Sequence, residues 1–274
     1  MYRKLRGLIW LLVFTLASPL AVASDEIWMA RANGQIDIAA DGSVAGFELA
    51  GSVGAEVDEL IQRQVDAWRF EPVIESGQAV PVQASVYLKL HAVPSGGRMQ
   101  VHVADARFYE IVERAASSSQ GDGSGHYPPP RYPNRPHLDG VMAEVITVFT
   151  VDMDGKMVDA DVERIELQTT ASMRGGDRKR YLEQFERSVL SAASEWRFRT
   201  DDLDFSKTGV ARVRMPVTFN LDGLAWGRLF VDDRSQPPTA PQDDRPAIAD
   251  LDSSGGRTSP RIALLTELQA PGAP

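Results

Sequence analysis

The sequence predicts a mixed α+β fold built from two similar β-β-α-β units, each a small antiparallel sheet with one packed helix. Three observations support this prediction. The tripeptide Trp-Arg-Phe occurs twice, as Trp68-Arg69-Phe70 and as Trp196-Arg197-Phe198. Upstream of each copy, an Asp-Gly pair (Asp41-Gly42 and Asp154-Gly155) separates two segments of alternating polarity. A segment with helical periodicity lies between each Asp-Gly pair and its Trp-Arg-Phe, so the same elements recur in the same order.

The N-terminal residues 1–23 have the organisation of a secretory signal peptide. Three basic residues precede an apolar run, and Ala21-Val22-Ala23 supplies an A-x-A cleavage site. We therefore expect export, with the mature chain beginning at Ser24 or Asp25. The alternative is an uncleaved inner-membrane anchor formed by residues 7–23, which is at the short limit for a membrane span.

The first unit is expected over residues 25–112. Asp-Gly flanked by β-forming residues is a strong hairpin signal, because both residues tolerate the positive φ of a tight turn. The apolar residues that follow recur at the spacing of an amphipathic helix, and a long alternating strand comes next. The expected elements are strands 35–38 and 44–49, a helix over 57–68, a strand over 82–90 and a possible fourth strand over 99–108.

The second unit is expected over residues 132–231, with the same succession of elements. Its third strand contains Pro216, which cannot donate to a ladder, so this strand is expected at a sheet edge or at a bulge. Two arrangements remain open for that edge: it is free, or the last strand folds back and covers it. The expected elements are strands 145–151 and 157–162, a helix over 182–196, a strand over 212–221 and a possible fourth strand over 224–231.

Two segments outside the units have the composition of unstructured chain. Residues 113–131 are rich in Gly, Ser and Pro and are expected to form a linker. Residues 232–274 are rich in Pro, Asp, Ser and Gly and are expected to be a disordered tail, with a brief helical turn at most over 262–268.

Composition excludes several classes of function. The net charge of −9 disfavours a nucleic-acid partner, and the absence of cysteine excludes thiol chemistry and cysteine-bound metal. None of the four histidines has another at the short spacing typical of a metal site, although two of them could be cross-strand neighbours in the first unit. No serine lies in the strand–turn–helix context of a nucleophile. We therefore expect no enzymatic activity, no catalytic residue, no metal and no cofactor.

The second unit resembles the C-terminal domain of the TonB family. The resemblance is carried by Tyr132-Pro133, the glycine after Asp139, the Asp-Gly hairpin, Trp196-Arg197-Phe198 and the strand that ends at Leu221, in this order. The first unit resembles a degenerate copy that lacks Tyr-Pro. The resemblance implies a periplasmic β-β-α-β module without an active site, which binds a peptide of an outer-membrane receptor as an added strand.

The expected function is non-catalytic protein binding in the periplasm, with a link to TonB-dependent energy transduction or outer-membrane transport as one option. The alternative is an envelope accessory or structural protein whose paired domains self-associate without a receptor. Membrane contact is expected only if the N-terminal segment is uncleaved. The candidate partner-binding residues are Tyr132, Pro133, Arg212, Arg214, Pro216 and Thr218, because a basic strand edge would favour an acidic extended peptide.

Overall fold

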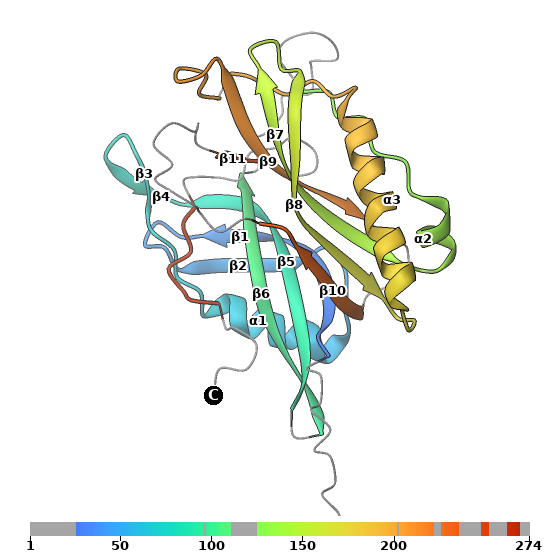
Figure 1. The fold of residues 1–274 in the computed structure, drawn as a ribbon. Helices are drawn as coiled ribbons and strands as arrows, with labels where there is room; N and C mark the ends of the chain where they lie inside the picture. The colour runs from blue at the N-terminus through green and yellow to red at the C-terminus, as the bar shows by residue number, and fades with distance from the viewer. Residues whose placement is uncertain are drawn as a thin grey trace, which may run out of the picture.

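The fold is mixed α+β and mostly β, as Figure 1 shows. The computed structural model describes residues 26–95, 97–110, 125–201, 203–221, 226–235, 248–251 and 262–268. The expected signal peptide and most of the expected linker lie outside these residues. Within the described part of the chain, no helix combines the length and the apolarity needed to cross a membrane.

The first unit follows the expected order of elements and adds a small hairpin. Its elements are β1 (Trp28–Ile38), β2 (Val44–Leu49), α1 (Ala55–Asp66), β3 (Val73–Glu75), β4 (Gln78–Val80), β5 (Val82–Ser95) and β6 (Arg98–Glu110). The turn between β1 and β2 requires glycine, since Gly42 has φ 81° and a Cβ there would collide with the carbonyl oxygen of Phe70. The Phe70 N–H donates to the Gly42 carbonyl at 2.8 Å, which ties the hairpin to the first Trp-Arg-Phe.

The residues expected to form the second unit also contain two strands, a helix and a further strand in this order. Its elements are α2 (Asn134–Leu138), β7 (Met142–Asp152), β8 (Met157–Thr169), α3 (Gly175–Ala193) and β9 (Val210–Phe219). Gly155 has φ 71°, and a Cβ there would collide with the carbonyl oxygen of Phe198. The Phe198 N–H donates to the Gly155 carbonyl at 2.8 Å, the counterpart of the contact in the first unit. Both tryptophans, Trp68 and Trp196, are buried as their helical spacing predicts.

The segment after β9 does not cover β9, which corrects the second of the two expected arrangements. This segment forms β10 (Gly227–Asp233), which pairs with β8 and, through two residues, with β1. The sheet order is therefore β11-β9-β7-β8-β10-β1-β5-β6, with β2 beside β1. This corrects the expectation of a separate antiparallel sheet in each unit, because the strands of both units join one sheet, in which β9 and β11 are parallel. Gly227 permits this pairing because a Cβ there would be 2.8 Å from the Gln168 side chain and 3.0 Å from the Thr169 nitrogen.

Parts of the C-terminal segment are ordered on the two units, which differs from the expected disordered tail. Residues Ile248–Asp250 form β11 beside β9, and Leu251 and Ile262 are buried. Residues 262–268 contain no helical turn, Leu264 forms a β-bridge with Phe70, and Leu265 N–H donates to the Arg69 carbonyl at 2.8 Å. These apolar residues are buried on the units despite the polar composition that surrounds them in the sequence.

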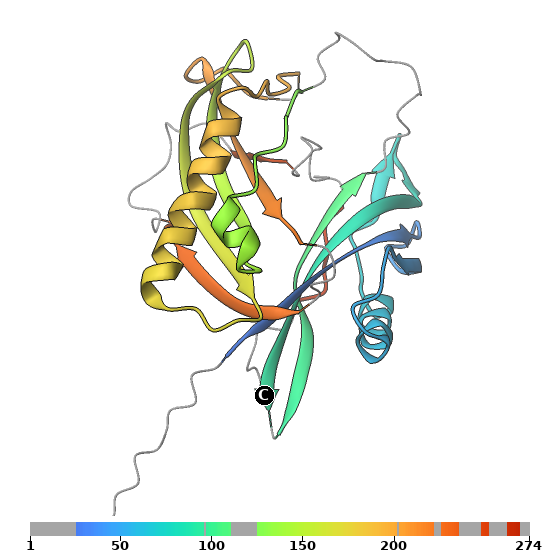
Figure 2. The same ribbon diagram turned by 90° about the vertical axis from the view of Figure 1, so that its right-hand side faces the viewer.

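The two longer helices, α1 and α3, lie on opposite outer sides of the molecule, as Figure 2 shows. Helix α3 packs on β7 and β8, and α1 packs on β2 and β6 of the first unit. Each helix covers its own hydrophobic cluster, one in each unit. The opposite faces of the two units, which carry the polar residues of the strands, face each other and form the site described next.

Candidate functional site: the β9 edge and the adjoining cleft

Strand β9 is paired along its whole length on one side and over three residues on the other. Its inner side pairs with β7 from Val210 to Phe219. Its outer side pairs in parallel with β11, with Ile248 opposite Arg212 and Asp250 opposite Arg214. Among the described residues, no strand pairs with the rest of this outer edge.

The contact between β9 and β11 combines a backbone hydrogen bond, an ion pair and a buried side chain. Leu251 N–H donates to the Arg214 carbonyl at 2.9 Å, and Leu251 is buried in the hydrophobic cluster of the second unit. The Arg214 Nη1 atom lies 3.2 Å from the Asp250 Oδ1 atom. Glu163 on β8 accepts from Arg214 Nε at 2.7 Å and from Nη2 at 3.0 Å. Hydrogen bonds from this arginine to Glu163 raise its pKa, so Arg214 is a fixed positive charge beside the edge.

Beyond β11, the β9 edge continues through Pro216 and Thr218. Backbone groups alternate along a strand, so these two residues direct theirs to the same side as Arg214. Pro216 has no N–H, which agrees with the prediction that it marks an edge. The edge therefore offers the Pro216 carbonyl and the Thr218 backbone groups to an added strand.

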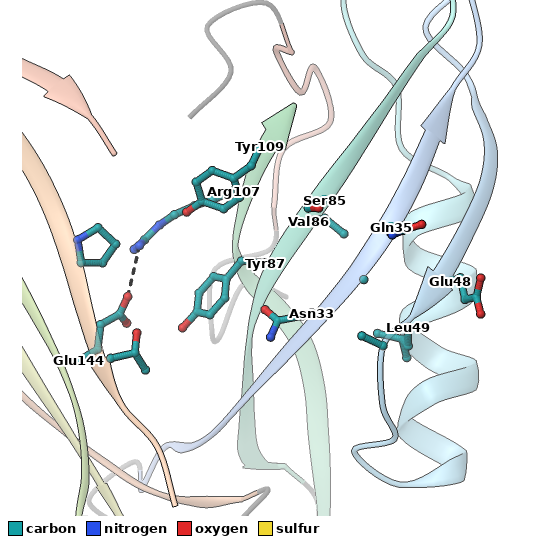
Figure 3. A pocket seen from close by; sticks show the side chains of 14 residues that line it. Asn33, Gln35, Glu48, Leu49, Ser85, Val86, Tyr87, Arg107, Tyr109 and Glu144 are labelled. Carbon is teal, nitrogen blue, oxygen red and sulfur yellow. Dashed lines mark hydrogen bonds and ion pairs between the residues drawn. The ribbon is translucent and has the colours of Figure 1, made fainter. Parts of the chain in front are cut away.

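A cleft of about 530 Å³ lies beside this part of β9, between the two units. Figure 3 shows Tyr87 and Arg107 reaching from the first unit toward Glu144 of the second. The cleft is lined by residues of β1, β2, β5, β6, β7 and β9: Asn33, Gln35, Glu48, Ser85, Tyr87, Arg107, Tyr109, Glu144, Pro216 and Thr218 among them. Most of these side chains are neutral hydrogen-bonding groups or aromatic rings, a lining that suits a polar chain better than an apolar ligand.

A buried ionic cluster adjoins the cleft through Glu144 and Arg107, which line it, and links the two units. Lys89 of β5 places its Nζ atom 2.8 Å from Glu144 and 2.7 Å from Glu166, and all three side chains are buried. Arg107 lies 3.2 Å from Glu144, and Arg31 Nη1 donates to Gln168 at 2.5 Å. Charges withdrawn from water in this way are costly unless paired. The ion pairs and the hydrogen bond of this cluster therefore join the polar face of the first unit to the polar face of the second.

Electrostatics at Glu144 are dominated by its three cationic neighbours. Burial would raise the pKa of Glu144, but Lys89, Arg31 and Arg107 outweigh it and hold this pKa well below the usual range. The neighbouring Tyr87 has its pKa raised, first by burial and then by Glu144. Its hydroxyl is buried and has no hydrogen-bond partner among the described residues. At neutral pH, Glu144 is thus ionised and Tyr87 is a neutral donor.

The predicted site residues separate into two groups. Pro216 and Thr218 lie on the edge and line the cleft, and Arg212 and Arg214 pair with β11. Tyr132 lies instead on the helix side of the sheet, where its hydroxyl donates to the Val141 carbonyl at 2.7 Å. Burial raises the pKa of Tyr132 to about 12, and its ring packs against Phe185 and Phe219 at the end of β9. Pro133 caps α2.

The ionic cluster was not anticipated, although one signal for it exists. Glu144 interrupts the apolar run from Val141 to Val148, and a carboxylate in such a run has to find a partner when the strand is buried. The sequence does not indicate that the partner is Lys89.

Two histidines lie opposite each other on β5 and β6. His91 and His102 are register partners with ring centroids 5.8 Å apart. Burial, then His102 and Lys89, lowers the pKa of His91 to about 4. Within the described part of the chain, no group of three or more His, Asp or Glu residues could hold a metal ion.

Comparison with known proteins relates part of this chain to TonB. Protein TonB from two strains of Xanthomonas campestris pv. campestris, B100 and ATCC 33913, is 32% identical to the chain over 94 residues. The aligned segment covers 34% of this chain, and the chain spans about a third (35%) of the length of these curated relatives. No family model and no solved structure matches. These findings support a TonB-like relationship over about a third of the chain.

Proposed function

We propose that this chain is an exported, TonB-like protein of the cell envelope that binds an extended segment of a partner protein by strand addition to β9. One observation carries the proposal: the outer edge of β9 already accepts a parallel strand, β11. Strand addition supplies affinity through main-chain hydrogen bonds and specificity through the side chains on each face. The partial similarity to TonB supports the same role.

We further propose that the role is non-catalytic. The charged groups beside the cleft form ion pairs with one another, with Lys89 between Glu144 and Glu166. A general acid or base needs a pKa near the working pH, and the lowered pKa of Glu144 does not suit that role. The cleft therefore suits recognition rather than proton transfer.

The proposed architecture is a tandem of two TonB-C-like units. Its support is the pair of equivalent contacts, Phe70 to Gly42 and Phe198 to Gly155, each at 2.8 Å. In both units the arginine of Trp-Arg-Phe also donates to the carbonyl of the preceding tryptophan, at 2.7 Å for Arg69 and 2.8 Å for Arg197. Equivalent hydrogen bonds at equivalent positions are expected of two copies of one unit.

Export, the partner and the link to transport belong to the same proposal. Cleavage after Ala23 would release the chain into the periplasm, where an outer-membrane receptor is the proposed partner and self-association is the alternative. N-terminal sequencing of the protein from a periplasmic fraction tests the export step, with Ser24 or Asp25 expected first. A full-length, membrane-bound product would contradict cleavage and favour the anchored form.

Site-specific photo-crosslinking in cells tests the binding site. A photoreactive residue at Thr218 is expected to capture an outer-membrane receptor, because Thr218 lies on both the edge and the cleft. The matched control is Val158 on β8, which is 55% exposed and does not line the cleft. Capture of a second copy of this chain at Thr218 would favour the self-association alternative, and equal capture at both positions would argue against a site on β9.

A further inference from the structure

Strand β11 occupies the edge to which a partner peptide would be added. Its three residues, Ile248–Asp250, run parallel to Arg212–Arg214. The following residue, Leu251, donates its N–H to the Arg214 carbonyl at 2.9 Å. A peptide that pairs with this part of β9 therefore has to displace β11 first.

The side chains of β11 show which chemistry the edge accepts. Asp250 forms an ion pair with Arg214 at 3.2 Å, and the next residue, Leu251, is 7% exposed within the hydrophobic cluster of the second unit. Successive residues of a strand face opposite sides of the sheet, so the acid and the leucine enter two different environments. The edge thus selects for an acidic residue followed by a large apolar one.

We propose that β11 is an intramolecular occupant that keeps the β9 edge closed until a partner segment of the same chemistry displaces it. The inferred partner segment is extended, runs parallel to β9 and carries an acidic residue followed by a large apolar residue. This inference rests on the proposed function, since it assigns the ligand class and the regulation of the same edge.

A longer segment has contacts available that β11 does not use. Because the pairing is parallel, a chain that continues beyond the position of Leu251 runs toward Pro216 and Thr218 of β9. Both residues line the cleft of about 530 Å³. There, backbone groups of β9 and polar side chains of the first unit can form hydrogen bonds with an added strand. A partner can therefore replace the contacts of β11 and add others, which is the condition for displacement.

A disulfide lock tests whether β11 closes the edge. Arg212 and Ile248 are register partners, a spacing that suits a disulfide, and the chain has no cysteine of its own. In the full-length double variant Arg212→Cys/Ile248→Cys, oxidation with diamide should fix β11 in place. The probe is a fluorescent synthetic peptide with the sequence of residues 246–255, followed by fluorescence anisotropy. Binding should be at least about tenfold weaker in the oxidised variant and recover on reduction, whereas each single-cysteine variant should respond to neither treatment.

A proline substitution tests the opposite perturbation. Ala249→Pro places a residue without an N–H in the middle of β11 and should release the edge. The peptide should then bind at least about tenfold more tightly than to wild type, since an edge open in a tenth of molecules weakens apparent affinity by that factor. Ala240→Pro, in the same C-terminal segment but outside β11, is the matched control and should leave affinity unchanged. Backbone amides of Arg212 and Arg214 should exchange faster only in Ala249→Pro.

The outcomes separate this inference from the proposed function. Equal affinity and equal amide exchange in wild type and Ala249→Pro would overturn the inference while leaving peptide binding intact. Faster exchange in Ala249→Pro without any peptide binding would overturn strand addition as the function of this edge, and with it the role of β11 as a competitor. Loss of binding on adding Arg214→Glu to Ala249→Pro would support both.

Discussion

Replacing Lys89 by methionine should destabilise the protein severely, because it leaves two buried carboxylates without their shared partner. Lys89 Nζ lies 2.8 Å from Glu144 and 2.7 Å from Glu166. These two glutamates are also register partners on β7 and β8. Methionine preserves the length and the apolar stem of lysine, so the substitution removes the charge with little change in packing.

The magnitude follows from the geometry of the cluster. At an effective dielectric constant near 20, each pair at this separation attracts by about 6 kcal/mol before the cost of desolvation is subtracted. Losing one partner of a buried pair costs about 3–5 kcal/mol, since the remaining charge stays buried. For a protein of this size, that loss lowers the melting temperature by roughly 6–20 °C.

Thermal unfolding followed by circular dichroism measures this effect, with a matched control in the same cluster. The double variant Lys89→Met/Glu166→Gln removes one charge of each sign and leaves Glu144 paired with Arg31 and Arg107, so it should recover much of the loss. The melting temperature of Lys89→Met should also approach that of wild type as the pH falls below about 5, because its buried glutamates can then take up protons. A melting temperature of Lys89→Met within about 2 °C of wild type at pH 7 would refute the reasoning, since the cluster could not then be buried and paired.

Three further perturbations have defined outcomes. Trp196→Ala should cost about 3–5 kcal/mol of unfolding free energy, since the ring is 2% exposed, and a midpoint like that of wild type would place the motif at the surface. In urea unfolding, Gly155→Ala should lower the free energy of unfolding more than Gly209→Ala does. Both glycines have φ 71°, but only Gly155 lies against the Phe198 carbonyl. Equal losses in the two variants would contradict that contact. The pKa of His91 is lowered to about 4 in the folded protein, so the unfolded protein binds this proton more readily. The free energy of unfolding should therefore be highest above pH 6.5 and fall as the pH drops from 6.5 to 4. His91→Phe should flatten that slope in unfolding measured across this range, and an unchanged slope would assign it to other groups.

Local patterns predicted the elements of each unit because those elements depend on nearby residues. The Asp-Gly pairs fix both hairpins, since Gly42 and Gly155 adopt the positive φ that the turns need. The apolar spacing of the two helices predicted the faces that they bury, and both Trp-Arg-Phe tryptophans lie in the cores as that spacing requires. These features could be predicted from windows of about a dozen residues.

The arrangement of the units could not be predicted because it depends on pairings between distant residues. Strand β10 pairs with β8 instead of β9, and β11 pairs with β9 from a segment whose composition resembles unstructured chain. An edge strand has free backbone groups whatever its sequence, so composition does not indicate which strand it joins. The partner of Glu144 likewise lies 55 residues earlier, at Lys89, and a single sequence contains no signal that links them.

The C-terminal segment contacts both units, and this double contact bears on how β11 competes. Leu265 N–H donates to the Arg69 carbonyl at 2.8 Å, just as His126 N–H donates to the Arg197 carbonyl at 2.8 Å in the second unit. Residues 262–268 therefore contact the first Trp-Arg-Phe in the same way that the segment before β7 contacts the second. Anchored there, β11 stays tethered near β9 even when displaced, at an effective concentration that short linkers bring to the order of millimolar. A free peptide with only the contacts of β11 would lose that competition at physiological concentrations. The contacts available at Pro216, Thr218 and the cleft are thus what would allow a true partner to succeed where a short acidic peptide would fail.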